Sequence, residues 1–194
     1  MLGIPLGLLY ANAGEWFIHR YVLHGLGKKK TSFWSFHWGE HHRAARKHDF
    51  LDPDYERSVF GNHAQGKEAL AVVGLMLAHA PLLPVAPLFT ATVWYSALNY
   101  LYTHKKAHLD PEWAKQHLKH HYDHHMGLDQ DKNWCVTHAW FDHLLGTRVD
   151  YAYDERGRAQ KPGVAEPTKP VAMPLQAAAV RNDQPANDQK KTAA

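Results

Sequence analysis

The feature that most constrains the fold is a long stretch of chain without a charged side chain. From Ala69 to His104 there is no Asp, Glu, Lys or Arg. A group of prolines lies near the middle of this stretch, where it would break a helix. We therefore expect a helical hairpin made of residues 69–83 and 87–102. Two helices made from this stretch of about 36 residues would have roughly 16 to 18 residues each, which is near the lower limit for crossing a bilayer. Uncharged runs of this length favour a membrane hairpin over one buried in a soluble core.

A third apolar segment, residues 2–18, begins the chain and contains Asn12 and Glu15. It lacks the basic start and the clear cleavage site of a signal peptide, so we interpret it as a retained membrane helix. Basic residues mark the cytoplasmic side of a membrane, which predicts that the histidine-rich segments face the cytoplasm. The basic residues that follow the three apolar helices are Arg20, Lys28, Lys29, Lys30, Lys105 and Lys106.

The rest of the chain divides into helix-prone segments and a tail. Residues 32–47, 111–126 and 137–145 are polar and suit short helices. The predicted fold is therefore all-α: an integral-membrane helical bundle with a cytoplasmic helical cap, formed by residues 1–158. Residues 159–194 are rich in Pro, Ala, Gln, Asn and Lys, and we expect a disordered polar tail because they offer little apolar surface to bury.

Histidine is the residue type that points to function. The chain has 17 histidines, all between His19 and His143, and imidazole is the commonest metal ligand in proteins. The single cysteine, Cys135, excludes an internal disulfide framework and a thiolate metal cage. The formal net charge of +3 does not call for a nucleic-acid partner.

The histidines form clusters whose spacing predicts two metal ions. Residues three or four apart share a helix face, so His37 can converge with His41. Adjacent residues such as His41 and His42 point about 100° apart, so each can serve a different metal. An all-nitrogen shell shared between facing helices suits iron, zinc or copper rather than magnesium or calcium. The clusters are His19 with His24, His37 with His41 and His42, His104 with His108, and His117 with His120 and His121, continued by His124 and His125.

The order and spacing of these clusters resemble the fatty acid hydroxylase superfamily, which includes fatty acid 2-hydroxylases, sterol desaturases and carotenoid hydroxylases. The resemblance runs from about Glu15 to Arg148 and includes a closing segment that begins at Asn133 and ends with Gly146-Thr147. It implies a dinuclear histidine-ligated centre in a cytoplasmic cap. The ligands that it implies are His19, His24, His37, His41, His42, His104, His108, His117, His120 and His121.

Other polar residues near the clusters are expected to support these ligands through hydrogen bonds. They are His124, His125, His138, Asp123 and Asp142. His79 lies inside the uncharged hairpin, where we expect it to satisfy a backbone carbonyl. The implied cofactors are two iron ions, for which zinc can substitute in a structure, together with O2.

The resemblance favours an O2-dependent di-iron hydroxylase that acts on a fatty-acyl or related long-chain lipid. A carotenoid- or sterol-type hydroxylase or desaturase is the alternative within the enzyme class. Electrons would come from a redox donor such as cytochrome b5 or ferredoxin, because the sequence has no Gly-x-Gly-x-x-Gly nucleotide fingerprint. The alternative from another class is a non-catalytic metal-binding or zinc-transport membrane protein, which the spaced clusters at helix ends disfavour.

Overall fold

The computed structural model describes residues 2–160, and within them the chain is all-helical, with a single isolated β-bridge between Tyr153 and Ala159. This confirms the all-α prediction. The predicted tail falls outside the described residues from residue 161 onward. The helices are α1 (Gly3–Phe17), η1 (Ile18–Leu26), η2 (His37–His42), α2 (Arg43–Lys47), η3 (Pro53–Glu56), α3 (Ala64–His79), η4 (Ala80–Leu82), α4 (Pro87–Leu109), α5 (Pro111–His117), α6 (Lys119–Met126) and α7 (Trp140–Leu144).

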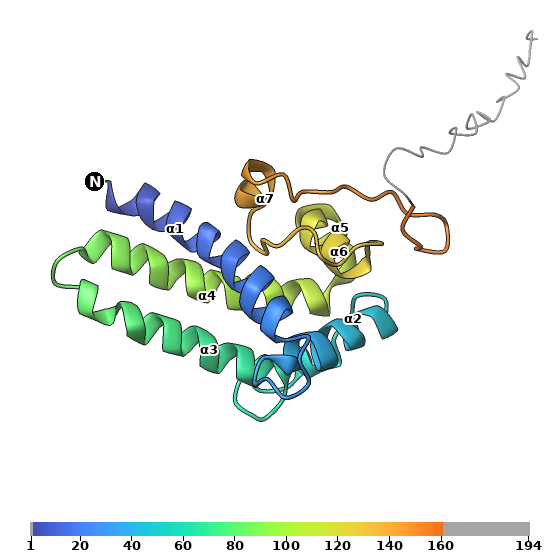
Figure 1. Ribbon diagram of the computed structural model, residues 1–194, viewed down its shortest axis with the longest axis horizontal. Helices are drawn as coiled ribbons and strands as arrows, with labels where there is room; N and C mark the ends of the chain where they lie inside the picture. The colour runs from blue at the N-terminus through green and yellow to red at the C-terminus, as the bar shows by residue number, and fades with distance from the viewer. Residues whose placement is uncertain (1, 161–194) are drawn as a thin grey trace, which may run out of the picture. The chain divides into compact units, whose positions relative to one another are not determined.

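Three long helices, α1, α3 and α4, form one part of the described unit (Figure 1). Helices α1 and α3 both pack against α4, which lies between them. The hairpin prediction is confirmed: α3 ends at His79, one 3-10 turn follows, and α4 begins at Pro87. Proline suits the first turn of a helix because the N–H that it lacks would have no partner there.

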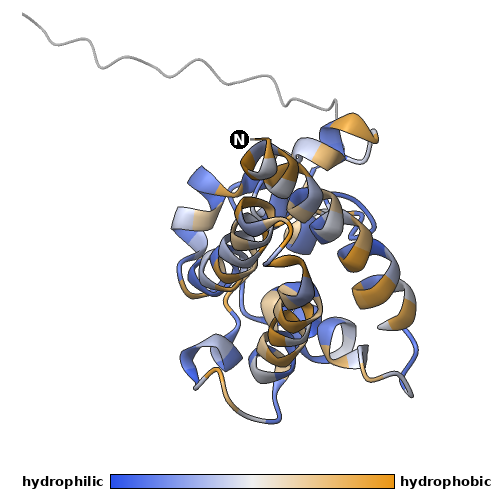
Figure 2. Cartoon of the chain, turned by 90° about the vertical axis from the view of Figure 1, so that its left-hand side faces the viewer, coloured by the Kyte–Doolittle hydropathy of each residue, from blue (hydrophilic) through white to orange (hydrophobic). Residues whose placement is uncertain are grey.

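The outer faces of these three helices carry many exposed apolar side chains, and Figure 2 colours the helices largely as hydrophobic. Exposed examples are Leu6 and Leu9 on α1, Val73 and Leu77 on α3, and Leu98 on α4. Across residues 2–160, none of the helices combines the length and the apolar character that crossing a membrane requires. The membrane part of the fold prediction stays a prediction.

The shorter helices η2, α2, α5 and α6 gather at one end of the long helices (Figure 1). The predicted helix 32–47 is helical only from Ser35 onward. The predicted helix 111–126 is interrupted at Leu118, whose backbone (φ −132°, ψ 42°) is not helical. Leu118 is buried in an apolar cluster with Phe50 and Tyr122. This break separates α5 from α6. The side of α6 that faces the rest of the cap is therefore not set by the direction that α5 faces.

Among residues 2–160, two segments are π-helices, and each carries a pair of histidines five residues apart. The first, η1, contains His19 and His24, and the second, η2, contains His37 and His42. In an α-helix, residues five apart point about 140° away from each other. The i→i+5 hydrogen bonding of a π-helix widens the turn and brings such residues nearly into line. The π-helices therefore direct both histidines of each pair to the same side.

Candidate metal centre

Two groups of buried histidines lie at the centre of the cap. In the first, five ring nitrogens lie within 4.8 Å of one another, and in the second, four do. The first group consists of His19, His24, His37, His42 and His124, and the second of His41, His104, His108 and His125. The adjacent histidines His41 and His42 belong to different groups, as the sequence predicted. His124 and His125 divide between the two groups in the same way.

The first group converges through its Nε2 atoms. His42 Nε2 lies 3.0 Å from His24 Nε2 and 3.2 Å from His124 Nε2. His19 Nδ1 is 2.6 Å from the carbonyl oxygen of Trp134, and His124 Nδ1 is 2.7 Å from that of Lys132. A carbonyl oxygen only accepts, so each Nδ1 carries the proton and each Nε2 presents a lone pair. Inward-facing lone pairs at this spacing repel one another unless a cation lies between them.

The second group is oriented by two buried carboxylates. Asp52 Oδ2 accepts a hydrogen bond from His41 Nδ1 at 2.7 Å, and Glu68 Oε1 accepts one from His104 Nδ1 at 2.7 Å. His108 Nδ1 donates to a backbone carbonyl, that of Phe50, at 2.8 Å. A carboxylate that holds the outer nitrogen of an imidazole fixes the ring's tautomer and makes the inner nitrogen a better metal ligand.

Several inner nitrogens of the second group have no partner. His41 Nε2, His104 Nε2 and both ring nitrogens of His125 are buried without a hydrogen bond, as is Nδ1 of the neighbouring His121. An unsatisfied buried polar atom is costly and rare in a folded protein. A transition-metal ion would satisfy His41 Nε2, His104 Nε2 and one ring nitrogen of His125, so the residues present fit a metal ion at the second group, as the facing lone pairs do at the first.

Burial keeps these imidazoles neutral, which is the form that binds metal. Loss of solvation lowers the pKa of His19, His37 and His42 well below its usual value of 6.5, and the neighbouring histidines lower it further. In the second group, burial does the same to the pKa of His108 and His125. The pocket is thus built for neutral nitrogen donors rather than for imidazolium ions.

The observed groups leave out three of the expected ligands and include two histidines that were expected only to support them. His117 is exposed and stacks on Trp113, and His120 Nε2 lies 2.9 Å from the carbonyl oxygen of Val136, so neither joins a group. Instead His124 and His125, which we expected to act as hydrogen-bonding supports, lie inside the groups. The expected set was the one that the sequence resemblance implied. The break at Leu118 leaves His117 on α5, apart from the histidines of α6.

His121, the remaining expected ligand, lies at the edge of the second group. Its Nε2 is 3.1 Å from His108 Nε2, and the residue is fully buried. It approaches the second group without being one of the four residues whose nitrogens all converge.

The other expected supporting residues act at a distance from the histidines or not at all. Asp142 accepts hydrogen bonds from the backbone N–H groups of Trp134 and Cys135, both at 2.8 Å, and so positions the segment whose carbonyl holds His19. Asp123 is buried with Lys119 and Arg148 as its ion-pair partners and contacts no histidine. His138 is exposed and stacks on Trp140.

Sequence reasoning missed Asp52 and Glu68, the two carboxylates that orient the second group. Asp52 lies in an irregular segment between α2 and η3, and its pairing with His41 depends on the path of that loop. One feature of the sequence could have drawn attention to Glu68: it is the last charged residue before the uncharged hairpin. Its Oε1 also accepts from Tyr100, and its Oε2 accepts from Tyr55.

Replacing Asp52 by asparagine is expected to weaken metal binding at the second group by about 10- to 100-fold, the usual cost of losing an outer hydrogen-bonding partner of a metal ligand. A competition titration with a chromogenic chelator measures this. Asp54→Asn is the matched control, because Asp54 pairs only with the exposed Arg57 side chain. Equal affinities in the two variants would contradict the orienting role of Asp52.

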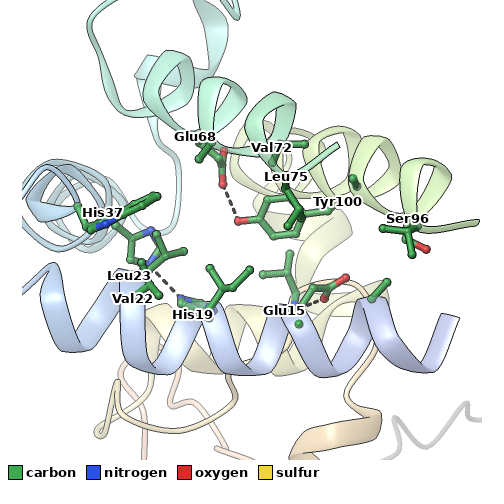
Figure 3. A pocket seen from close by; sticks show the side chains of 18 of the residues that line it. Glu15, His19, Val22, Leu23, His37, Glu68, Val72, Leu75, Ser96 and Tyr100 are labelled. Atoms are coloured by element: carbon green, nitrogen blue, oxygen red, sulfur yellow. Dashed lines mark hydrogen bonds between the residues drawn. The ribbon is translucent and has the colours of Figure 1, made fainter. Parts of the chain in front are cut away.

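An apolar cavity of about 370 Å³ borders the first histidine group. It lies between α1, α3 and α4, and Figure 3 shows His19 and His37 at one end of it. Glu68 and Tyr100 also line its wall, so the cavity reaches the second group only through the carboxylate that holds His104. The remaining lining is mainly aliphatic, with small residues such as Ala11, Gly14 and Ala97.

Comparison of the chain with protein-family models, with curated proteins and with solved structures found no match. The metal centre is therefore described by its own geometry.

Proposed function

We propose that this protein is an O2-dependent two-iron oxidoreductase that hydroxylates a long-chain, fatty-acyl type of lipid at a membrane. The observation that carries the proposal is the apolar cavity that ends on His19 and His37. A metal-storage or transport site needs ligands and a path for ions, whereas a cavity walled by aliphatic side chains suits a hydrocarbon chain.

The residues of the cap divide the tasks of such a reaction. Iron bound by the two histidine groups would supply the redox chemistry needed to cleave an unactivated C–H bond with O2. Ile18, Val22 and Leu23 line the cavity beside the histidines and would exclude water from the reacting carbon. The outer hydrogen bonds to Trp134, Lys132, Asp52 and Glu68 keep the ligands in place without relying on the metal.

Hydroxylation consumes one O2, two electrons and two protons for each C–H bond converted to C–OH, with water as the second product. The electrons are assigned to an external donor such as cytochrome b5 or ferredoxin. The exposed apolar faces of α1, α3 and α4 support the proposed membrane location, with the cap on the cytoplasmic side. Both α1 and α3 line the cavity, so a lipid chain that enters between these two helices would reach it.

The test compares lipids of cells that express the intact protein with those of cells that express Gly14→Leu. A Cβ at Gly14 would meet no atom within 4 Å, and the residue lines the cavity, so leucine there would occupy substrate space without disturbing the helix contacts. We expect untargeted mass spectrometry to find lipids that gain one oxygen with the intact protein. The Gly14→Leu product should fall about tenfold or more, since about 1.4 kcal/mol of lost binding has that effect.

Gly74→Leu is the matched control. Gly74 is also helical and open around its Cβ, but it is exposed on α3 and does not line the cavity. It should keep full product, and both variants should keep their metal. Loss of two hydrogens in place of a gained oxygen would change the assignment to a desaturase. No lipid difference, with iron and a redox donor supplied, would overturn the oxygenase proposal and favour metal binding without catalysis.

A further inference from the structure

At the end of the cavity that is remote from the histidines, three aromatic rings pack together, one from each long helix. Tyr10 on α1 lies 5.5 Å from the ring centre of His79 on α3 and 5.3 Å from that of Phe89 on α4. Tyr10 lines the cavity itself. Along α3 the lining residues end at Leu75, one turn before His79, and along α4 they end at Val93, one turn before Phe89. We call these three residues, Tyr10, His79 and Phe89, the aromatic plug.

A hydrogen bond across the helices joins two of the three plug residues. His79 Nδ1 lies 2.8 Å from the carbonyl oxygen of Leu75, so Nδ1 carries the proton and donates, as the sequence predicted. The other ring nitrogen, Nε2, then accepts a hydrogen bond from the Tyr10 hydroxyl at 2.9 Å. His79 is buried at this apolar end of the molecule. Helices α1 and α3 both pack on α4, and this bond joins α1 and α3 directly to one another at the end of the cavity.

The position of the plug implies a defined length. Tyr10 and His19 are nine residues apart on one continuous helical stretch, which corresponds to about 13 Å at 1.5 Å per residue. An extended alkyl chain advances about 1.25 Å per carbon, given sp3 C–C bonds of about 1.5 Å and tetrahedral angles. The distance from the histidines to the plug therefore holds about ten carbons.

We propose that the aromatic plug is the specificity-determining element of the cavity: it limits the unbranched alkyl chain beyond the reacting carbon to about ten carbons. This rests on the proposed function, since it assigns the length of the same apolar substrate. The plug acts by shape, because Tyr10 and Phe89 place rings rather than charges at the end of the chain.

The experiment measures binding, without turnover. The metal-loaded protein in lipid nanodiscs is mixed with a series of straight-chain alcohols, and the rise in its melting temperature is recorded for each length. For the intact protein the stabilisation should increase with each carbon and stop increasing at about ten. In Tyr10→Ala this limit should rise by about three to five carbons, because an extended chain of that length matches the removed ring and hydroxyl.

Three further variants make the result specific. Tyr10→Phe keeps the ring and should keep the length limit. Tyr102→Ala removes an exposed tyrosine of α4 that does not line the cavity and should also keep it. Phe89→Ala removes the plug residue of α4 without removing the bond between Tyr10 and His79. If Tyr10→Ala does not fold, Phe89→Ala takes its place in the measurement of the length limit.

The possible results separate the plug from the proposed function. An unchanged limit in Tyr10→Ala and Phe89→Ala, with metal retained, would overturn the plug and leave the apolar substrate standing. A metal-loaded intact protein that no alcohol of any length stabilises would overturn both, because no alkyl chain would then enter the cavity.

Discussion

Alanine at His124 or at His125 is expected to remove one of two bound metal ions per chain. The purified intact protein should hold two, one at each histidine group. His124 supplies Nε2 to the first group, and both ring nitrogens of His125 are buried without a partner in the second. Binding of a metal at such a site contributes about 10 to 16 kcal/mol in small zinc domains, so losing a ligand changes occupancy measurably. Elemental analysis after dialysis against a weak chelator gives the stoichiometry.

His117→Ala and His120→Ala are the matched controls, since both lie in the same region and outside both groups. They should keep two metal ions. The opposite pattern, with metal lost in His117→Ala and His120→Ala and kept in the other two, would restore the ligand set implied by the sequence resemblance. It would contradict the arrangement of α6 that the break at Leu118 produces.

The metal-stripped protein is expected to lose stability steeply as the pH falls below about 6.5. Burial lowers the pKa of His19, His42, His108 and His125 well below 6.5, so they stay neutral in the folded protein. In the unfolded chain the same side chains titrate near 6.5, so below that pH the unfolded chain binds more protons and gains stability relative to the fold. Each histidine lowers the free energy of unfolding by up to about 1.4 kcal/mol per pH unit, down to its folded pKa.

Thermal unfolding of the stripped protein between pH 8 and pH 5 measures this loss. Burial lowers the pKa of His124 to about 3. This histidine therefore lowers the free energy of unfolding progressively as the pH falls from about 6.5 to about 3. The metal-loaded protein should resist acid further, because bound metal competes with protons for the same nitrogens. His117→Ala removes an exposed histidine and should leave the profile unchanged. A flat melting temperature from pH 7.5 to pH 5.5 would contradict the neutral, buried state of the histidines.

Much of the fold could be predicted from local sequence. The uncharged stretch and its prolines indicated the hairpin of α3 and α4, because a proline is not tolerated in the interior of a helix and suits only its first turn. The adjacent pair His41-His42 indicated two metals, because neighbouring residues on any helix point to different sides. Both inferences depend on geometry that the backbone fixes within one or two turns. The structure contains the hairpin and places His41 and His42 in different histidine groups.

The membership of the two groups depended on tertiary structure. The face that α6 presents follows from the break at Leu118, where a buried apolar contact outweighs helix continuity. The pairing of His37 with His42 rather than with His41 follows from a π-helix, which helical periodicity of 3.6 residues does not anticipate.

The second group shows most clearly which features followed from the sequence and which depended on tertiary structure. Its histidines were visible in the sequence as metal ligands, because few other roles explain so many imidazoles in one region. Asp52 and Glu68, which orient them, pair with His41 and His104 across 11 and 36 positions of the chain. The sequence by itself determined the kind of donor and predicted two histidine groups. Only the folded chain decided which histidines share a group and which carboxylates hold them, because those contacts join segments whose relative positions are set by packing and not by spacing.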